Sequence, residues 1–229
     1  MSLNHIGVAR RYIVRADPAD VDRLSQFGVA TVHEALGRAG LMRPTLRPIY
    51  PGAQCCGTAI TVLLQPGDNW MLHVAAEQIR EGDVVVAACT SDCDDGFFGD
   101  LLATSFVARG CKGLVIDGGV RDIRVITGMK FPVFSRAVSA KGTTKATPGS
   151  VNVPIVCAGT VVNPGDVVIA DDDGVVVVPA AAAGAVADAA QAREDKEAKT
   201  RARLAAGELG LDIYDMRGKL ASAGFRYLD

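Results

Sequence analysis

The sequence predicts an α/β fold, with one layered domain and helical extensions at both ends. Between residues 83 and 138, short apolar strands alternate with helix-like segments, which indicates parallel strands joined by right-handed crossovers. Residues 153–179 are rich in valine and contain two turn sequences, as is typical of a meander of short strands. No stretch has the composition of a linker and no internal repeat is present, so we expect a single domain over residues 1–229.

Two helices are expected within residues 17–40. Asp17 can cap the first helix, and Pro18 occupies its first position. Thr31 and Glu34 have the spacing of a capping box, which predicts that the second helix begins at Thr31.

The α/β core is expected at residues 54–179, followed by C-terminal helices at 180–229. The turns at 163–166 and 171–174 are hairpin signals. In a parallel sheet, ligands bind outside the carboxyl ends of the strands. The expected strands are 57–64, 84–89, 113–117 and 132–138, and the expected helices are 70–80, 100–110, a short one ending at 128, and 180–206.

Composition limits the partners and the compartment. The net charge of -2 argues against a nucleic-acid surface, and no apolar run approaches the ~20 residues that span a bilayer. The first residues lack the apolar core of a secretory signal. We therefore expect a cytoplasmic protein that binds neither nucleic acid nor membrane, with reduced thiols. The cysteines are Cys55, Cys56, Cys89, Cys93, Cys111 and Cys157.

Several catalytic motifs are missing from the sequence. It contains no phosphate loop, no dinucleotide fingerprint, no H-E-x-x-H zinc motif and no G-x-S-x-G elbow. Cys89 and Cys93 are spaced C-x3-C, but no second pair completes a zinc site, so structural thiols are the better interpretation. The remaining candidates for chemistry are carboxylates and a guanidinium.

Asp100 and the pair Arg121–Asp122 each follow the carboxyl end of an expected strand. Carboxylates are hard ligands suited to Mg²⁺ or Mn²⁺, and Arg121 offers a planar fork for a substrate carboxylate. The alternative is that Asp100 only caps its helix and Arg121–Asp122 is a surface pair, and spacing alone does not separate the two.

Backbone groups at the start of the helix after Gly99 are a further candidate. The amides of Leu101 and Leu102 lack helical partners at this position and are available to an anion. Asn69 is a secondary candidate for binding distal carboxylates of the substrate. The alternative, which we favour on sequence grounds, is that Asn69 caps a helix and His73 packs on it.

The spacing Asp-x20-Arg-Asp, with GDLLAT at its start and IDGGVRD at its end, resembles a family of class II pyruvate aldolases. These are the 4-carboxy-4-hydroxy-2-oxoadipate and 4-hydroxy-4-methyl-2-oxoglutarate aldolases. Further similar segments extend the resemblance over nearly the whole chain. They are GVATVHEALGRAG, PGDNWMLHVA, SVNVPIVCAG and NPGDVVIADDDGVVVVP.

That family shares its fold with the regulator of ribonuclease E activity A, so the resemblance implies a layered αββα sandwich. It also implies roles for the site residues. Asp122 would ligate the divalent metal, Mg²⁺ or Mn²⁺, and Asp100 would hold its water. Arg121 would bind the pyruvyl portion of the substrate and stabilise the enolate, while the amides of Leu101 and Leu102 would hold the pyruvate carboxylate.

The resemblance further implies a homo-oligomer, either a trimer or a hexamer built from two trimers. A glutamate from the C-terminal helix of a neighbouring subunit would complete the water shell. Glu197 is our choice for this residue, and Glu194, one turn away, is its competitor.

The implied reaction is metal-dependent retro-aldol cleavage of 4-carboxy-4-hydroxy-2-oxoadipate to pyruvate and oxaloacetate, in the meta-cleavage catabolism of protocatechuate and gallate. The methyl analogue would also be a substrate, and oxaloacetate decarboxylation a side activity. No lysine has a clear apolar site for an imine route. The alternative function is that of a non-catalytic regulator, which binds a ribonuclease. The regulator that shares this fold lacks the aspartate corresponding to Asp122. The preferred substrate, the metal and the general base stay open.

Overall fold

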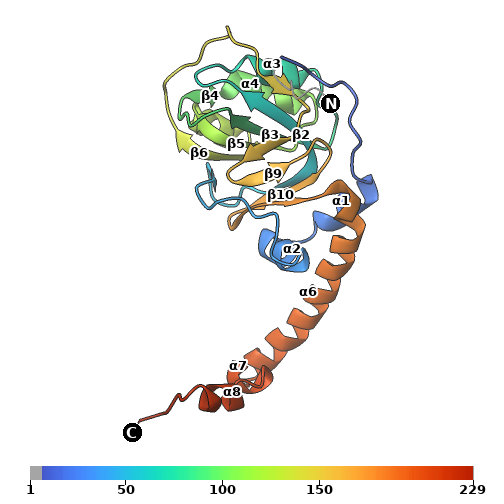
Figure 1. Cartoon of the computed structure of the whole chain (residues 1–229), viewed down its shortest axis with the longest axis vertical. Helices are drawn as coiled ribbons and strands as arrows, with labels where there is room; N and C mark the ends of the chain where they lie inside the picture. The colour runs from blue at the N-terminus through green and yellow to red at the C-terminus, as the bar shows by residue number, and fades with distance from the viewer. Residues whose placement is uncertain (1–6, 229) are drawn as a thin grey trace. The chain divides into compact units, whose positions relative to one another are not determined.

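A nine-stranded sheet forms the centre of the computed structural model, which describes residues 7–228 (Figure 1). Its order is β1-β6-β5-β3-β2-β10-β11, with β4 added to β5 and β7 to β2. The strands are β1 (Arg47–Pro48), β2 (Cys55–Leu64), β3 (Asp83–Cys89), β4 (Gly96–Phe98), β5 (Gly113–Val120), β6 (Val133–Val138), β7 (Ser150–Val151), β8 (Ile155–Cys157), β9 (Thr160–Val162), β10 (Val167–Asp171) and β11 (Gly174–Val178).

The predicted parallel arrangement is confirmed, because β2, β3, β5 and β6 are parallel neighbours. The short strand β4, which the sequence pattern missed, is also parallel to β5. The remaining pairings in this sheet are antiparallel. The helices are α1 (Pro18–Leu24), α2 (Val29–Ala35), α3 (Trp70–Ala76), α4 (Asp100–Ala108), α5 (Ile123–Gly128), α6 (Ala183–Ala205), α7 (Gly210–Ile213) and α8 (Arg217–Ser222), with a 3-10 turn at Ala180–Ala182.

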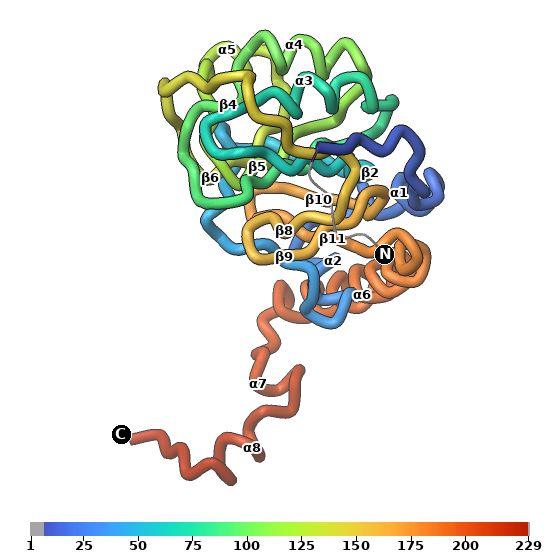
Figure 2. The backbone as a smooth tube through the Cα atoms, turned by 45° about the horizontal axis from the view of Figure 1, so that its top comes forward, coloured from blue at the N-terminus to red at the C-terminus, as the bar shows by residue number. Residues whose placement is uncertain are grey.

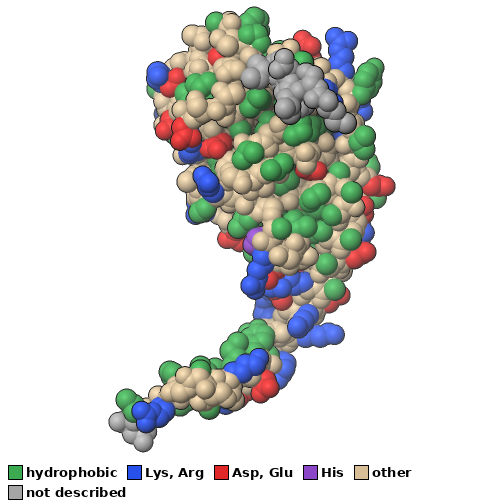
Figure 3. Space-filling model, viewed as in Figure 1, with side chains coloured by type: hydrophobic (Ala, Val, Ile, Leu, Met, Phe, Trp, Pro, Cys, Tyr) green, Lys and Arg blue, Asp and Glu red, His purple; other side chains and the backbone are tan. Residues whose placement is uncertain are grey.

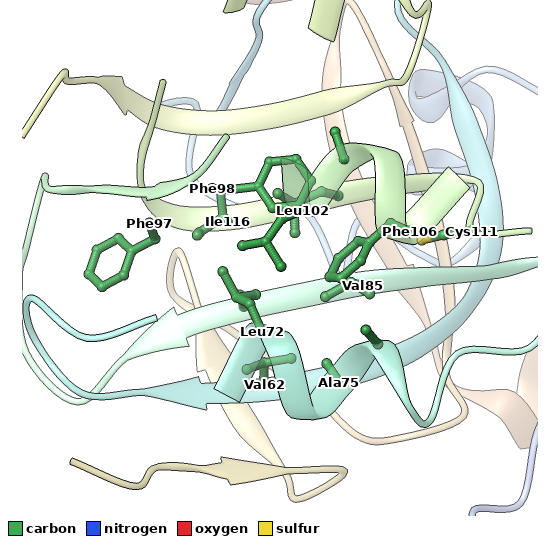
Figure 4. Packing of buried hydrophobic residues seen from close by; sticks show 14 of the residues in the cluster. Val62, Leu72, Ala75, Val85, Phe97, Phe98, Leu102, Phe106, Cys111 and Ile116 are labelled. Atoms are coloured by element: carbon green, nitrogen blue, oxygen red, sulfur yellow. The ribbon is translucent and has the colours of Figure 1, made fainter. Parts of the chain in front are cut away.

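Three buried clusters define the layers of the fold. On one face of the central strands, side chains such as Val62, Val85 and Ile116 pack against α3 and α4, as Figure 4 shows. Because apolar residues line both faces of these strands, each face requires a covering layer.

The opposite face of the central strands packs against a second β layer. Val86 and Phe134 belong to a cluster that also contains Ile155 of the β8–β9 hairpin and Val168 of β10. The hairpin lies beside β10 and β11 in the tube view (Figure 2). The outer face of β10 and β11 packs against α1, α2 and the first turns of α6. The layers are therefore αββα, as expected, with helices at both ends of the chain.

The first N-terminal helix begins as predicted. The amide of Ala19 donates to the carboxylate of Asp17 at 2.9 Å, and Pro18 is the first helical residue. The prediction for the second helix is wrong, because α2 begins at Val29 rather than at Thr31. The amide of Val29 donates to the carboxylate of Asp171 at 2.8 Å, so the residue that caps α2 comes from the β10–β11 turn.

Of the two predicted hairpins, the turn at 171–174 is confirmed and joins β10 to β11. The turn at 163–166 is not a hairpin, because β9 pairs with β8 while β10 pairs with β2 and β11. Its Asp166 is buried, and its carboxylate accepts hydrogen bonds from the amides of Asn163 and Ala180. The turn therefore connects two sheets.

By their internal contacts, the residues form two compact units, one up to Ala190 and one from Gln191. In the second unit, Arg203 pairs with Glu208 at 2.6 Å and Arg217 pairs with Asp212. The prediction of a single domain stays a prediction. Among the described residues, no helix is both long enough and apolar enough to cross a membrane. All six cysteines are free, as expected for reduced thiols.

Candidate active site

The candidate site is built where β4 and β5 end side by side. Gly96 and Phe98 of β4 pair with Gly119 and Val120, the last two residues of β5. Directly after β5, the amide of Arg121 donates to the carbonyl of Phe98 at 2.8 Å. The pairing of these short segments brings the loop before α4 and the loop before α5 together.

Asp122 has a left-handed backbone conformation, with φ of 56°, and stands at the N-cap position of α5. This conformation is uncommon for a residue other than glycine, although aspartate tolerates it better than most. The side chain of Asp122 does not cap α5. Instead, its Oδ2 accepts a hydrogen bond from the amide of Asp100 at 3.4 Å and lies 3.5 Å from the Nε of Arg121.

Gly99 makes this close approach possible. A Cβ atom at Gly99 would overlap Oδ2 of Asp122 and would lie 3.1 Å from Nε of Arg121. The side chains of Arg121 and Asp122 remain 47% and 39% exposed, so a ligand can reach them. An ion pair with this exposure contributes little to stability. The pair is thus free to exchange partners when a ligand binds.

The first turn of α4 differs in one respect from the expectation. The amide of Leu101 donates to the carboxylate of Asp100 at 2.9 Å, so an anion would have to displace that carboxylate to use it. The Leu101 side chain is 81% exposed, whereas Leu102 is buried in the cluster of Figure 4. Burial of Leu102 anchors the turn and holds its backbone in place.

These residues share a small hollow of about 100 Å³. It brings the predicted Asn69 and Leu101 to the same place as Arg121, although Asp122 is not part of its lining. Lys145 also lines it, and sequence reasoning missed this residue because it lies in a loop without any motif. The hollow is lined by Asn69, His73, Phe97, Gly99, Asp100, Leu101, Leu102, Arg121 and Lys145.

Asn69 stands at the N-cap of α3, but its side chain makes no capping hydrogen bond, so the capping alternative is wrong. Asp68 caps the helix instead, because its carboxylate accepts from the amide of Trp70 at 2.8 Å. The Asn69 side-chain amide donates to the carbonyl of Phe97 at 2.8 Å. Asn69 therefore connects α3 to β4 beside the hollow. Its Oδ1 is buried and has no partner within the described chain.

His73 lies on the last turn of α3, next to Lys145. Partial burial lowers the pKa of His73, and the positive charge of Lys145 lowers this pKa further. Both effects disfavour the charged imidazolium. The neutral form of His73 is therefore favoured, and Lys145 and Arg121 are the other basic side chains of the hollow.

The residues of the candidate site lie within a region that is similar to known proteins. The family model described as "RraA-like: Aldolase/RraA" matches residues 29–177. The chain belongs to the RraA-like family. This match includes the whole candidate site apart from Glu197.

A relative from Halalkalibacterium halodurans, provisionally named 4-hydroxy-4-methyl-2-oxoglutarate aldolase, is 33% identical over 188 residues. These residues are 80% of this chain and 90% of the relative. A Burkholderia multivorans protein with the same provisional name is 32% identical over 143 residues, which are 62% of this chain and 87% of that protein.

Two solved structures are similar to this chain as well. An uncharacterised protein from Pseudomonas syringae has a TM-score of 0.74 at 30% identity, covering 86% of this chain and 97% of that one. Streptomyces coelicolor RraAS2, described as an unusual member of the RNase ES inhibitor RraA protein family, has a TM-score of 0.74 at 28% identity. That match covers 83% of this chain and 99% of that one. The proteins that resemble this chain thus carry two kinds of name. Some are named aldolases, and one is described as a member of an inhibitor family.

The donor set of this RraA-like chain suits a hard cation. Among the described residues, no group of three or more His, Cys, Asp and Glu side chains is arranged to hold a metal ion. Magnesium, however, usually takes one or two protein carboxylates and keeps several waters. The partly exposed carboxylates of Asp122 and Asp100, on adjacent loops, fit that requirement.

Glu197 lies on α6 in the C-terminal unit, where its carboxylate pairs with the Nε of Arg193 at 2.8 Å. Glu194 belongs to the same helix. The structure brings Gly99, Asp100, Arg121 and Asp122 together within one unit. The assignments of Glu197 and Glu194 stay predictions.

Proposed function

We propose that this RraA-like protein is a divalent-metal-dependent pyruvate aldolase that cleaves 4-carboxy-4-hydroxy-2-oxoadipate to pyruvate and oxaloacetate, and also cleaves the methyl analogue. The observation that carries the proposal is the joining of Asp100, Arg121 and Asp122 across two adjacent loops beside a hollow. The provisional aldolase names of relatives at 33% and 32% identity support it.

Asp122 would hold the metal, Mg²⁺ or Mn²⁺, and Asp100 would hold a water of its hydration shell. When bound, such an ion acts as a Lewis acid toward the 2-keto oxygen of the substrate. A metal route also agrees with the environment of the one lysine in the hollow. Lys145 is exposed and not in the apolar pocket that an imine-forming lysine occupies.

Arg121 would bind the 2-keto acid end of the substrate. As the bond between C3 and C4 breaks, negative charge develops on the keto oxygen, and a guanidinium fork aimed at that position stabilises the charge. The first-turn amides of α4 would hold the pyruvate carboxylate. For the amide of Leu101, this requires the Asp100 carboxylate to turn away, which frees it to organise the water that takes the 4-hydroxyl proton.

We also propose that the protein works in the cytoplasm as a homo-oligomer, a trimer or a hexamer, with Glu197 of a neighbouring subunit completing the site. Hydrophobic side chains gather on the face seen in Figure 3, over the region that Figure 1 labels β9 and β10. Val156 and Val161 on the β8–β9 hairpin are 60% and 59% exposed. Beside the hollow, Leu101 is exposed as well. Apolar surface of this kind supports association.

The second candidate function is inhibition of a ribonuclease, which the description of Streptomyces coelicolor RraAS2 favours. A third is decarboxylation of oxaloacetate, a 2-keto acid that would give the same enolate. This reaction is expected here as a side activity. The ratio of kcat/KM for the aldol substrate and for oxaloacetate distinguishes an aldolase from a dedicated decarboxylase.

The deciding experiment measures pyruvate release from 4-carboxy-4-hydroxy-2-oxoadipate with Mg²⁺ and after EDTA treatment. We expect release that EDTA abolishes and added Mg²⁺ restores. Arg121→Ala should lose about 100-fold or more in kcat/KM, because it removes stabilisation of the developing charge. Arg124→Ala, an exposed arginine on α5, is the matched control and should retain activity. Turnover that is indifferent to EDTA would contradict the metal, and stoichiometric ribonuclease binding without turnover would favour the second candidate.

A further inference from the structure

The loop between β6 and β7 passes beside the hollow and carries Lys145. No helix or strand forms within residues 139–149, so this loop depends on other contacts for its shape. Those contacts come from the segment before α3. The amide of Thr144 donates to the carbonyl of Gly67 at 2.8 Å, and the amide of Asn69 donates to the carbonyl of Thr144 at 3.1 Å.

Asp68 makes the strongest of these contacts. Its Oδ2 accepts from the amide of Ala146 at 2.5 Å, the amide of Thr147 at 2.9 Å and the hydroxyl of Thr144 at 3.3 Å. Its Oδ1 accepts from the amide of Trp70. One carboxylate thus joins the start of α3 to the residues on both sides of Lys145.

Asp68 is only 3% exposed, which is unusual for a carboxylate that forms no ion pair within the described chain. Burial of a charge is costly unless hydrogen bonds satisfy it. Three of the four donors belong to the loop, namely two backbone amides and one hydroxyl, so the loop satisfies the charge of Asp68 and this charge in turn holds the loop. The backbone around Lys145 is therefore more ordered than its lack of regular structure suggests.

Lys145 itself is exposed and has no carboxylate partner among the described residues. It lines the hollow together with Arg121 and the first turn of α4. Because Lys145 and Arg121 line the same hollow of about 100 Å³, a dicarboxylate held at one end by Arg121 has its second carboxylate within reach of Lys145. An ammonium group without a partner in such a hollow suits a second carboxylate of the ligand.

We propose that Lys145 binds the carboxylate on C4 of a 2-keto acid substrate, and that Asp68 positions Lys145 by holding the loop at Thr144, Ala146 and Thr147. Lys145 is then the residue that selects dicarboxylic and tricarboxylic keto acids over pyruvate. The assignment rests on the proposed function, in which Arg121 takes the 2-keto acid end. It adds a cation for the other end of the substrate.

The test compares the binding of two ligands that the protein does not cleave, by calorimetry with Mg²⁺ present. 2-Oxoglutarate carries a carboxylate on C4 but no hydroxyl group, and pyruvate lacks C4 altogether. Lys145→Met should weaken 2-oxoglutarate binding about 10- to 100-fold, the loss of a charge-assisted hydrogen bond, and leave pyruvate binding unchanged. Lys145→Arg should retain most of the wild-type affinity for 2-oxoglutarate, because it keeps the positive charge. Lys112→Met, an exposed lysine just before β5, is the control.

The role of Asp68 is tested with Asp68→Asn. The change should lower the affinity for 2-oxoglutarate and spare that for pyruvate. Asp166→Asn is a matched control, because Asp166 is also buried and also accepts backbone amides, but it lies away from the loop. Thr144→Val, a milder change that removes one donor to Asp68, should act in the same direction by about 2- to 5-fold.

Kinetics separate this proposal from the proposed function. With 4-carboxy-4-hydroxy-2-oxoadipate, Lys145→Met should raise KM with little change in kcat. The wild-type protein could release no pyruvate and still bind 2-oxoglutarate more tightly than pyruvate, with this preference lost in Lys145→Met. In that case the aldolase function fails and the Lys145 assignment stands. The assignment is overturned if Lys145→Met weakens both ligands equally, or neither. The positioning role of Asp68 is overturned if Asp68→Asn changes the affinities for 2-oxoglutarate and pyruvate by the same factor. The control Asp166→Asn should not distinguish the two ligands.

Discussion

The backbone amide of Asp100 donates to the side-chain Oδ2 of Asp122 at 3.4 Å. This contact joins the first residue of α4 to the residue that precedes α5. The carboxylate of Asp122 is therefore placed by the backbone of the other loop, whereas the carboxylate of Asp100 accepts from Leu101 in its own loop. Small displacements of either loop should affect both residues together.

Gly99→Ala should reduce kcat/KM by about 100-fold without unfolding the protein, because a misplacement of about 1 Å has an effect of that size on catalysis. The new Cβ would overlap Oδ2 of Asp122 and push the two loops apart. Steady-state kinetics and a thermal melt measure the two effects. Gly128→Ala is the control, because a Cβ at Gly128 meets no atom within 4 Å. Equal activity of both variants would contradict the coupling.

Asp122→Asn should raise the Mg²⁺ concentration required for half-maximal activity and lower kcat by about 100- to 1,000-fold, since an amide is a weaker ligand than a carboxylate. A titration of activity against Mg²⁺ gives both quantities. Asp92→Asn removes another carboxylate, one that is 99% exposed and pairs with Arg136, and should leave both unchanged. An unaltered Mg²⁺ requirement in Asp122→Asn would remove Asp122 as the metal ligand.

The pKa of His73 should lie below its ordinary value and should rise in Lys145→Met. Partial burial and the charge of Lys145 both lower this pKa, and the substitution removes the second effect only. The pKa in Lys145→Met should therefore remain somewhat depressed. An NMR titration of the imidazole protons measures it, with His73→Gln to assign the signal. A His73 pKa that is identical in wild type and Lys145→Met would place Lys145 too far away to act at the hollow.

Asp68 should stabilise the fold at neutral pH and lose this effect in acid. Burial by itself would raise the pKa of Asp68, but hydrogen bonds from Ala146, Thr147, Trp70 and Thr144 outweigh burial and lower it. The contribution is thus complete above the ordinary carboxyl pKa of 3.8 and is lost as the pH falls through the lowered value.

The free energy of unfolding of Asp68→Asn should accordingly be about 1–3 kcal/mol lower than that of wild type at pH 7. The difference should shrink at pH 3 and below. Urea unfolding at a series of pH values measures it. A difference that stays constant from pH 7 to pH 2 would contradict the lowered pKa.

The elements that were predicted correctly depend on neighbours in sequence. Asp17 and Pro18 start α1 because a cap and its helix are adjacent residues. The strands from β3 to β6 were recognisable because apolar runs alternate with helix-like segments and because such units have one handedness. The pairing of Asp100 with Arg121 and Asp122 followed from the same rule, since parallel strands end at one edge of the sheet.

The errors arose where a distant residue outcompeted a local one. Thr31 and Glu34 have the spacing of a cap, but Asp171 reaches the amide of Val29, and the helix starts there. Asn69 holds a capping position, yet Asp68 caps α3 and Asn69 reaches Phe97 instead. Short-range propensities are worth about 1 kcal/mol, and buried tertiary contacts overcome them.

Periodicity, turn residues and helix starts along the chain were therefore sufficient for the parallel α/β core and for the Asp100, Arg121 and Asp122 loops, while the αββα layering came from the family resemblance. The packing of those layers was required to bring Lys145 into the hollow and to bury Asp68 against Ala146 and Thr147. No local pattern specifies such contacts, because they depend on which distant segments meet after the sheet has formed.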